Sequence, residues 1–407
     1  MSSIFIKDVL LDGRKTNILI EDNRFVDLAA DFDAFKSQGA QKSAARDFRL
    51  INGGGLAILP PFYNTHTHAA MSLLRGYADD MPLKTWLEDH IWPREDKLTP
   101  EDIYEGTRMA IREMIRTGSV FMNNMYFDID EEIRAIEETG IRACVGVTFM
   151  DNHSKAQRDS KVDFIRSWKG TPSGRVQIAA APHAIYTVSE DVLRSVRTIA
   201  TENNIPIHIH LSETESEVAD CIKLHGKTPV KYLDDMGFLG PDVICAHLVH
   251  LTDEDIRIIV DRGVVAAHCP CSNMKLSSGI APMQKLSEAG CRITLGTDGS
   301  ASNNNLDMRE EMKFAALLAK SVGEPTDAPA TEVLKWATVN GAQTFGIDAG
   351  EIKVGKLADA ILVDTENYKM QPCTNLISNW VYSADSSCID TVICDGRVLM
   401  CGGELEV

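Results

Sequence analysis

The feature that most constrains the fold is an alternation of short apolar runs with longer amphipathic segments between residues 60 and 345. Short β-branched or apolar runs predict buried strands, whereas apolar residues spaced three and four apart predict helices. Strands that alternate with helices pair in parallel, and eight of them favour an α/β fold, a (β/α)8 TIM-type barrel. An open, doubly wound sheet is the alternative that the strand number leaves open. The expected strands are 57–64, 119–126, 142–149, 177–182, 206–211, 243–246, 264–268 and 292–296, and the clearest helices are 101–116, 189–203, 228–236 and 307–322.

The two ends of the chain lack this alternation and carry strand-like runs with tight-turn signals. In the tail, Asp395-Gly396 and Gly402-Gly403 are dipeptides typical of hairpins. We expect the two ends to pair with each other in one small β-sandwich domain beside the barrel. The predicted division of the chain is the N-terminal part of the β-sandwich at 1–59, the barrel at 60–348 and the C-terminal part of the β-sandwich at 349–407.

Composition and charge limit the classes of partner. The chain has 407 residues with 41 Lys and Arg against 59 Asp and Glu, so its formal net charge is −18. This negative charge repels polyphosphates and anionic lipid surfaces, which argues against nucleic acid or membrane partners. The chain has neither a signal-like start nor an apolar run approaching 18 residues. Its ten scattered cysteines include no CxxC pair, which indicates a reducing compartment, and we expect a cytoplasmic protein.

Most of the histidines lie at the ends of the expected strands. Of the eleven in the chain, seven lie at or just after the end of a strand, and one aspartate follows the eighth strand. In a barrel all strands point the same way, so residues far apart in sequence meet at the C-terminal face, where barrel active sites lie. We therefore expect a cluster formed by His66, His68, His183, His208, His210, His247, His268 and Asp298.

This cluster contains the ligand types of a metal site. Two adjacent imidazoles with a third histidine and a carboxylate suit Zn²⁺ or Fe²⁺ and leave a position for water. His66 and His68 share one side of their extended segment because side chains alternate along a strand. Residues 179–186 contain no lysine that could bridge two ions after carboxylation, so we expect one metal ion.

The third histidine ligand has two candidates on one strand. His208 and His210 share a face in the same way, and either could reach the metal. We choose His210, because it lies closer to the C-terminal rim and because Glu213 follows it by three residues. A carboxylate at that distance can turn back over the metal, while His208 is then expected behind the ligands or inside the barrel.

Longer motifs resemble a known family. The segment 60–79, PPFYNTHTHAAMSLLRGYAD, resembles the metal-binding opening of the amidohydrolase superfamily. The similarity is to its 5′-methylthioadenosine/S-adenosylhomocysteine deaminase branch, which is related to the triazine chlorohydrolases. Further matches are HIHLSET at 208–214, AHLVHL at 246–251, HCPCSNMKL at 268–276, LGTDGSASNNNLDM at 295–308 and GEIKVGKLADAILVD at 350–364. This ordered set of motifs is far more specific than the HxH pair alone.

The resemblance implies a role for each matching residue. It implies one divalent metal ion as cofactor, with Zn²⁺ expected and Fe²⁺ or Mn²⁺ as alternatives. Trp86 and Glu95 match positions that enclose a nucleoside and bind its ribose hydroxyls, and His183 matches a residue that contacts the purine or ribose. The implied metal ligands are His66, His68, His210 and Asp298, and the implied catalytic residues are Glu213, His247 and Asp298.

The implied reaction is hydrolytic deamination of an adenine nucleoside to an inosine-type product and ammonia. Metal-bound hydroxide attacks C6, Glu213 protonates ring N1 and later passes a proton to the departing amine, and His247 with Asp298 orients the hydroxide. Two alternatives stay open. One is deamination or dechlorination of another N-heterocycle, such as guanine, a pterin, 6-aminodeoxyfutalosine or a triazine. The other is a metal-binding scaffold without catalysis.

The sequence departs from the family at the 5′ side of the substrate. Members that use S-adenosylhomocysteine place an arginine after the third barrel strand for its carboxylate, and this chain has Val147 there. Arg158 is the candidate replacement as a substrate-binding residue. An uncharged 5′ group, as in 5′-methylthioadenosine, 5′-deoxyadenosine or adenosine, needs no such arginine. The 5′ substituent is therefore left open, as is a homo-oligomer that pairs through the barrel helices.

Overall fold

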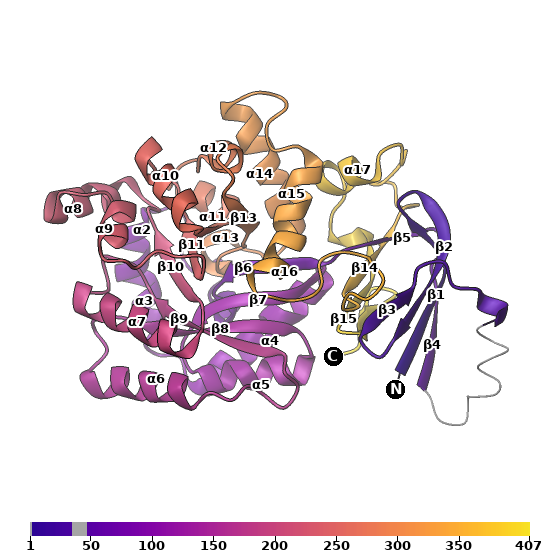
Figure 1. Ribbon diagram of the computed structural model, residues 1–407, viewed down its shortest axis with the longest axis horizontal. Coiled ribbons are helices and arrows are strands. Elements are labelled where there is room, and N and C mark those ends of the chain that lie inside the picture. Colours follow the sequence, from indigo (N-terminus) through magenta and orange to yellow (C-terminus); the bar gives the residue numbers. More distant parts are fainter. Residues whose placement is uncertain (1, 35–46) are drawn as a thin grey trace.

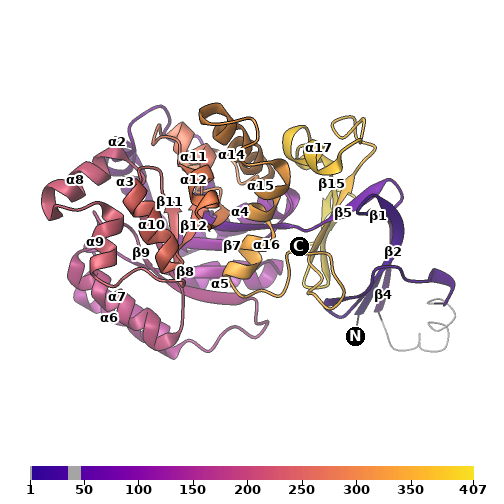
Figure 2. The same ribbon diagram turned by 45° about the horizontal axis from the view of Figure 1, so that its top comes forward.

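The computed structural model describes residues 2–34 and 47–407, which form two bodies in contact. A ring of strands surrounded by helices takes the central part of the chain, and a second sheet formed by both chain ends lies against one side of it (Figure 1). The N and C termini both lie at that second sheet, and the turned view has the same arrangement (Figure 2). The chain therefore leaves its first strands, builds the barrel and returns to them.

Eight parallel strands form the barrel in the order of the sequence, each hydrogen-bonded to the next. Several hydrogen bonds connect the first strand region to the last. Among them, the Thr65 hydroxyl donates to the Leu295 carbonyl (2.9 Å), and the Asp298 N–H donates to the His66 carbonyl (3.0 Å). Gly296 is required here, because a Cβ at that position would lie 2.7 Å from the Cβ of His66. The predicted α/β barrel is confirmed. Its strands are β6 (Phe62–Thr67), β7 (Ser119–Tyr126), β8 (Arg142–Phe149), β9 (Val176–Pro182), β10 (Ile207–Leu211), β11 (Val243–His247), β12 (Val265–His268) and β13 (Arg292–Leu295).

Helices follow the barrel strands and cover the outside of the ring (Figure 1). Several begin at a residue whose side chain accepts an N–H bond from the first turn, as Thr99 and Thr252 do in reciprocal capping boxes. The four helices predicted from apolar spacing, at 101–116, 189–203, 228–236 and 307–322, are all present. The helices are α4 (Pro100–Arg116), α5 (Ile129–Thr139), α6 (Lys155–Ser167), α7 (Glu190–Asn203), α8 (Glu215–His225), α9 (Pro229–Asp235), α10 (Asp253–Arg262), α11 (Pro270–Lys275), α12 (Met283–Glu288), α13 (Ser300–Asn303), α14 (Met308–Val322), α15 (Ala330–Ala337), α16 (Val339–Thr344) and α17 (Leu376–Tyr382), with short turns at η1 (Ala69–Leu74), α2 (Leu83–Thr85), η2 (Trp86–Ile91), α3 (Trp92–Glu95) and η3 (Ser386–Cys388).

The expected strand 57–64 is wrong as a single element. Its first half is β5 (Leu56–Leu59), which belongs to the second sheet and pairs antiparallel with β14 (Ala360–Asp364). Its second half is β6, which opens the barrel. Pro60-Pro61 separates the two, because proline has no N–H to donate and cannot continue a hydrogen-bonded ladder.

Nine strands from the two chain ends form one continuous sheet, which confirms the predicted pairing of the ends. β5 and β14 join the two halves, with Ile361 opposite Leu59. The sheet curls on itself, because the Phe25 N–H also donates to the Lys356 carbonyl over 3.1 Å, just before β14. Apolar side chains of both halves share one buried cluster. The other strands are β1 (Ser2–Leu11), β2 (Arg14–Glu21), β3 (Arg24–Asp27), β4 (Asp47–Asn52), β15 (Ile389–Cys394), β16 (Arg397–Cys401) and β17 (Glu404–Leu405).

A buried ionic network joins the barrel to the second sheet. Asp359, just before β14, is fully buried and accepts hydrogen bonds from the Tyr63 hydroxyl (2.6 Å), the Asp395 N–H (2.7 Å) and the Arg142 guanidinium. Arg142, at the start of β8, also donates to the Asp395 carboxylate over 2.7 Å. Buried charges persist only when they are paired, so each member of this network depends on the others.

Replacing the central carboxylate of this network should strongly destabilise the protein. We expect Asp359→Ala to lower the free energy of unfolding by about 3–5 kcal/mol, because the buried Arg142 guanidinium then lacks one of its carboxylate partners. Urea denaturation followed by circular dichroism measures the loss. Glu101→Gln, which removes an exposed partner of Arg134 at 3.0 Å, is the control and should change stability by less than about 1 kcal/mol. Equal effects of the two substitutions would contradict the network.

Two further observations describe the chain as a whole. Within 2–34 and 47–407, no helix has both the length and the apolar composition that a bilayer span requires. All ten cysteines are free thiols. Cys144 and Cys245 lie inside barrel strands, where burial raises the pKa of their thiols, so these two side chains serve packing.

Candidate active site

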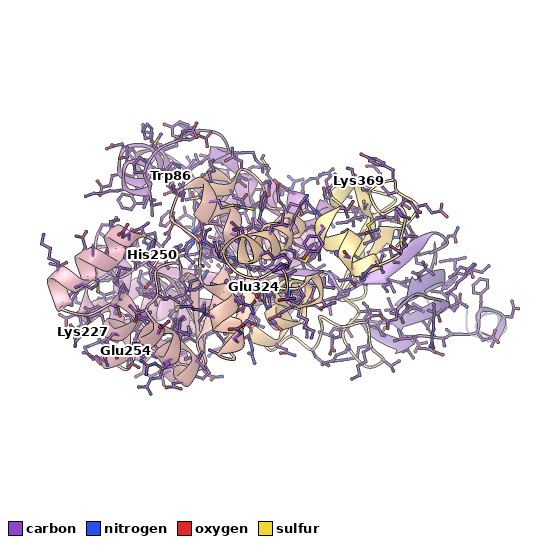
Figure 3. The ribbon with its side chains drawn as sticks, turned by 90° about the horizontal axis from the view of Figure 1, so that it is seen from above. Trp86, Lys227, His250, Glu254, Glu324 and Lys369 are labelled. Atoms are coloured by element: carbon purple, nitrogen blue, oxygen red, sulfur yellow. The ribbon has the colours of Figure 1, made fainter. Side chains whose placement is uncertain are left out.

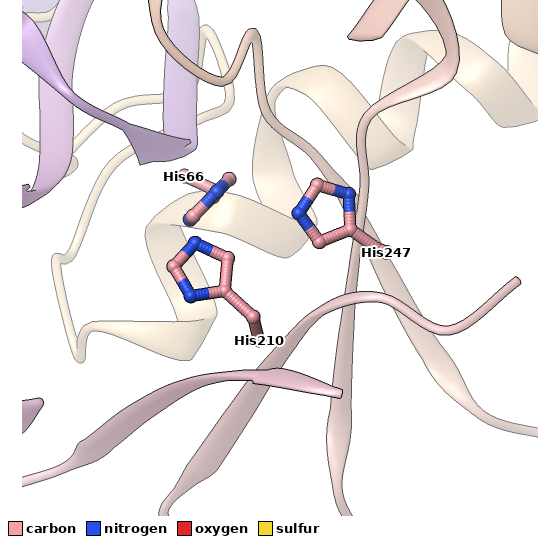
Figure 4. Close-up of side chains that lie close together, drawn as sticks. All are labelled: His66, His210 and His247. Atoms are coloured by element: carbon pink, nitrogen blue, oxygen red, sulfur yellow. The ribbon is translucent and has the colours of Figure 1, made fainter. Parts of the chain in front are cut away.

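The C-terminal ends of the barrel strands bring the predicted histidines together. The ring of His66, from β6, lies 4.9 Å from that of His210, from β10, and 5.3 Å from that of His247, from β11, between ring centroids. Figure 4 shows these three rings facing one another across a small gap. His68 lies beside them, with its ring centroid 5.0 Å from that of His66. Three segments that are far apart in the sequence therefore build one cluster.

The turns that carry this cluster are strained. Ser212, His247 and Asp298 follow or end barrel strands, and their φ angles are 52°, 75° and 60°. Left-handed backbone costs of order 1–3 kcal/mol at a residue other than glycine, and such residues gather at functional sites. The strain therefore marks the same rim that the histidines occupy.

Four donor atoms converge at the spacing of metal ligands. The Asp298 Oδ1 lies 3.4 Å from the His66 Nε2 and 3.3 Å from the His68 Nε2, and the His68 Nε2 lies 3.2 Å from the His210 Nε2. Ligands held about 2.1 Å from a tetrahedral ion lie about 3.4 Å from one another. The His66 Nε2 is buried and has no hydrogen-bond partner in the described part of the chain. Two overlapping groups of donor atoms lie within 4.8 Å of one another, one from His66, His68 and Asp298 and the other from His66, His210 and His247, so the cluster has the donors of a divalent metal site.

The other nitrogen of each ring fixes its orientation. The His68 Nδ1 donates to the Met125 carbonyl over 2.6 Å, and the His210 Nδ1 donates to the His183 carbonyl over 2.7 Å. The His66 Nδ1 lies 2.8 Å from the His208 Nε2. Metal-binding histidines use their second nitrogen in this way, which leaves the Nε2 lone pair for the ion. His208 thus lies behind His66 and away from the four converging atoms.

Burial keeps two of these rings neutral, whereas at His68 the neighbouring Asp298 carboxylate outweighs burial and raises the pKa. Desolvation lowers the pKa of His66 to about 4, and it lowers the pKa of His210 well below its usual value. Burial opposes ionisation of Asp298, but the neighbouring imidazoles of His66 and His68 outweigh it and hold the pKa of that carboxyl well below its ordinary range. Neutral imidazoles with one carboxylate are the protonation states that a divalent cation requires.

The Asp298 carboxylate is held by three donors. Its Oδ2 accepts from the Ser272 hydroxyl (2.6 Å) and the Ser302 hydroxyl (3.0 Å), and its Oδ1 accepts from the Gly299 N–H (2.8 Å). These bonds turn Oδ1 toward the imidazoles. Sequence reasoning missed both serines, although Ser272 lies within the HCPCSNMKL motif and Ser302 lies four residues after Asp298.

Glu213 and His247 form a second pair beside the converging atoms. The Glu213 carboxylate is buried, accepts from the Ser278 hydroxyl over 3.3 Å and lies 3.8 Å from the His247 Nε2. Burial raises the pKa of Glu213. The His247 Nδ1 donates to the Asn273 Oδ1 over 2.9 Å, so its Nε2 carries the lone pair. The pair can therefore hold and exchange a proton close to the four donor atoms.

A small cavity of about 60 Å³ opens onto these groups. Its wall includes the predicted substrate residues Trp86, Glu95 and His183 together with Glu213 and Asp298. It continues outward into a wider cavity through a shared apolar wall, whose side chains include those of Leu83, Leu87, Trp92, Phe127 and Met150. One small molecule can thus contact the buried acid and the outer wall together.

Each predicted substrate residue has a defined partner. The Trp86 indole N–H donates to the Ala78 carbonyl over 3.0 Å. In Figure 3 this residue lies on the barrel half of the molecule, away from Lys369 in the turn between β14 and α17. The Glu95 carboxylate accepts from the Tyr126 hydroxyl over 2.6 Å, and burial raises the pKa of Glu95 to about 7. The His183 Nδ1 lies 2.9 Å from the Thr187 hydroxyl.

Arg158 is not brought to the cavity walls. Its guanidinium donates to the backbone carbonyls of Asp151 and His153, in the loop that precedes α6. Neither cavity includes Arg158 or Val147 in its lining. Val147 is fully buried within β8. Arg158 lies in the first turn of α6, and the sequence carries no signal for the backbone groups that its side chain contacts, so spacing alone could not place this arginine.

Comparisons with known proteins agree with this geometry. The model of the amidohydrolase family matches residues 57–399. A 5′-deoxyadenosine deaminase of Methanothermobacter thermautotrophicus is 44% identical, over 97% of this chain and 91% of its own. A 5-methylthioadenosine/S-adenosylhomocysteine deaminase of Archaeoglobus fulgidus is 50% identical, over 87% of this chain and 85% of its own.

A solved structure extends the likeness to the fold. The adenosine deaminase of Xanthomonas campestris with bound zinc superimposes with a TM-score of 0.90 at 33% identity, over 99% of this chain and 94% of its own. The match covers the barrel and the sheet of the chain ends together. With a family model over most of its length and relatives of this identity, the chain belongs to the amidohydrolase family.

Proposed function

We propose that the protein is a metal-dependent hydrolytic deaminase of adenine nucleosides. The observation that carries this proposal is the common cavity: a buried acid, Glu213, lines the same space as His68, His210, Asp298 and Glu95. The relatives that are named deaminases of adenine nucleosides support the same reaction. The expected products are an inosine-type nucleoside and ammonia.

The metal site of this proposal consists of His66, His68, His210 and Asp298. Its nitrogen and oxygen donors favour one Zn²⁺, as does the zinc in the Xanthomonas campestris relative. Fe²⁺ and Mn²⁺ accept the same ligand types. When bound, the ion supplies a water of lowered pKa as nucleophile at neutral pH.

The chain's own residues move the protons. Glu213, whose pKa burial raises, is suited to donate a proton to ring N1 of adenine and so to make C6 electrophilic. The same carboxylate then receives a proton from the attacking water and passes it to the departing amine. His247, held by Asn273, accepts a hydrogen bond from the water at its Nε2, and Asp298 orients it from the other side.

The nucleoside is held by the residues around the inner cavity. In this proposal Glu95 accepts hydrogen bonds from the ribose hydroxyls, and its contact with Tyr126 fixes the carboxylate for that purpose. His183 contacts the purine or ribose, and Trp86 closes the apolar wall. This wall also keeps bulk water from the reacting groups, which strengthens the electrostatic interactions among them.

The wider cavity favours a substrate without negative charge on its 5′ group. Its acidic lining residues outnumber its one lysine, Lys84, which lies 4.0 Å from Glu88. His153, also in the lining, has its pKa lowered to about 4 by burial and is neutral. A carboxylate would meet like charges there, so we propose 5′-deoxyadenosine, 5′-methylthioadenosine or adenosine as the substrate class.

The free thiols of the chain support a cytoplasmic location.

Ammonia release by the Zn²⁺-loaded protein across a substrate panel tests this function. We expect turnover of the three neutral nucleosides, with kcat/KM at least about tenfold above that for S-adenosylhomocysteine. Arg158→Ala should leave that ratio unchanged, because the guanidinium is occupied by backbone carbonyls. Activity on guanine or a chloro-triazine with none on any adenine nucleoside would overturn the proposal. Selective loss of S-adenosylhomocysteine turnover in Arg158→Ala would restore the substrate role of that arginine.

A further inference from the structure

Glu217 binds the segment that carries Glu213. It lies in the first turn of α8, is 7% exposed and points back toward the turn that follows β10. Its Oε1 accepts from the Ser212 N–H over 2.9 Å, and its Oε2 accepts from the Glu213 N–H over 2.8 Å. One carboxylate thus binds two successive peptide N–H groups, which is how backbone turns bind anions.

The same turn is held from its other side. The Ser212 carbonyl accepts from the Val249 N–H over 3.0 Å and from the His250 N–H over 2.9 Å. Ser212 has a φ of 52°, a backbone conformation that residues other than glycine rarely adopt without support. The bonds from Glu217 and from 249–250 therefore hold the turn in a conformation that it would not keep alone.

The charge of Glu217 has no conventional partner. Among the residues that the structure describes, no lysine or arginine forms an ion pair with this buried carboxylate, and burial raises its pKa to about 7. Burying a carboxylate without a cation is costly, and a merely structural turn could be built from neutral groups. The turn that the Glu217 carboxylate binds ends at Glu213, so a role of Glu217 in placing Glu213 would explain this buried carboxylate.

We propose that Glu217 is a positioning residue for the deamination, which fixes the backbone of Ser212 and Glu213 so that the Glu213 carboxylate stays beside His247. This inference rests on the proposed proton-transfer role of Glu213. Glu217 itself lines the outer cavity, whereas Glu213 lines the inner one, so Glu217 acts through the peptide groups and does not touch the reacting atoms. A displacement of about 1 Å at a catalytic group is enough to lower kcat by about 10²-fold.

The test is Glu217→Gln, measured in two independent ways. Glutamine has one carbonyl oxygen and an NH2 group. Its oxygen can accept from one of the two backbone N–H groups, but its NH2 group is a donor and leaves the other N–H group without an acceptor. We expect kcat to fall about 10- to 100-fold with KM within about threefold and with unchanged metal content. Hydrogen exchange followed by mass spectrometry should show faster exchange in the peptide that contains Ser212 and Glu213.

Asp255→Asn is the matched control. Asp255 is also a buried carboxylate in the first turn of a helix, α10, and it accepts from the Thr252 N–H over 2.9 Å, but it belongs to neither cavity wall. Both variants should lose similar stability, and only Glu217→Gln should lose kcat. Equal kcat losses in the two variants, or kcat and exchange unchanged in Glu217→Gln, would overturn the inference. If the wild type releases no ammonia, the proposed function fails, and the exchange rates still decide whether Glu217 holds the turn.

Discussion

Removing the divalent metal should lower ammonia release from 5′-deoxyadenosine by at least about 10³-fold, and added Zn²⁺ should restore it. Free water has a pKa of about 15.7 and is almost entirely un-ionised at pH 7, whereas a metal-bound water titrates near about 7. The four converging donors come from three separate strand ends, so no other single group in the site can take their place. Dialysis against a chelator, followed by metal analysis and an ammonia assay, gives the measurement.

Two neighbouring histidines provide the matched variants. His210→Ala removes a converging donor and should abolish metal retention, because three ligands with a weaker fourth position hold zinc poorly. His208→Ala removes only the partner of the His66 Nδ1, so it should retain the ion with affinity reduced about 10- to 100-fold. Full turnover by metal-free protein would contradict the metal site, and a His208 variant that loses the ion more readily than the His210 variant would reverse the ligand assignment.

The cluster was predictable because it depends on topology. Parallel strands of a barrel all end at one face, so a histidine at a strand end can be assigned to a common site without knowing any side-chain contact. The choice between His208 and His210 could also be made from the sequence. Side chains two residues apart on β10 share a face, so the two histidines differ only in their position along the strand. The structure brings His210 to the other donors and leaves His208 behind His66.

Features that depend on chain direction or on long-range contacts could not be predicted in this way. The apolar run across 57–64 looked continuous, yet the proline pair sends its two halves into different sheets. Asp359 is an ordinary acidic residue in a loop by sequence, and only the meeting of β6, β8 and β14 makes it the centre of a buried network. The position of Glu217, four residues after Glu213, is only a weak sequence signal for a role in the site. Its hydrogen bonds run to backbone N–H groups, which every residue type has, so the sequence cannot reveal them.

Glu213→Gln should lower kcat by about 10²- to 10⁴-fold while the protein keeps its metal and binds nucleoside. Glutamine has the shape of glutamate but cannot donate a proton to ring N1 or carry one to the departing amine, and general acid–base help of this kind is worth that factor. The Glu213 carboxylate lies 3.8 Å from the His247 Nε2 and accepts from Ser278, so the amide fits the same space without disturbing the four converging donors.

The control for this variant is Glu215→Gln, which neutralises an exposed carboxylate two residues away, at the start of α8, and should leave kcat unchanged. Since Glu213→Gln barely turns over, its dissociation constant for 5′-deoxyadenosine can be measured directly by calorimetry. A loss of kcat with unchanged affinity and unchanged metal content identifies an interaction made only in the transition state. A variant with wild-type kcat would instead assign the proton transfer to another group, and His247, 3.8 Å from the Glu213 carboxylate, is the next group to test.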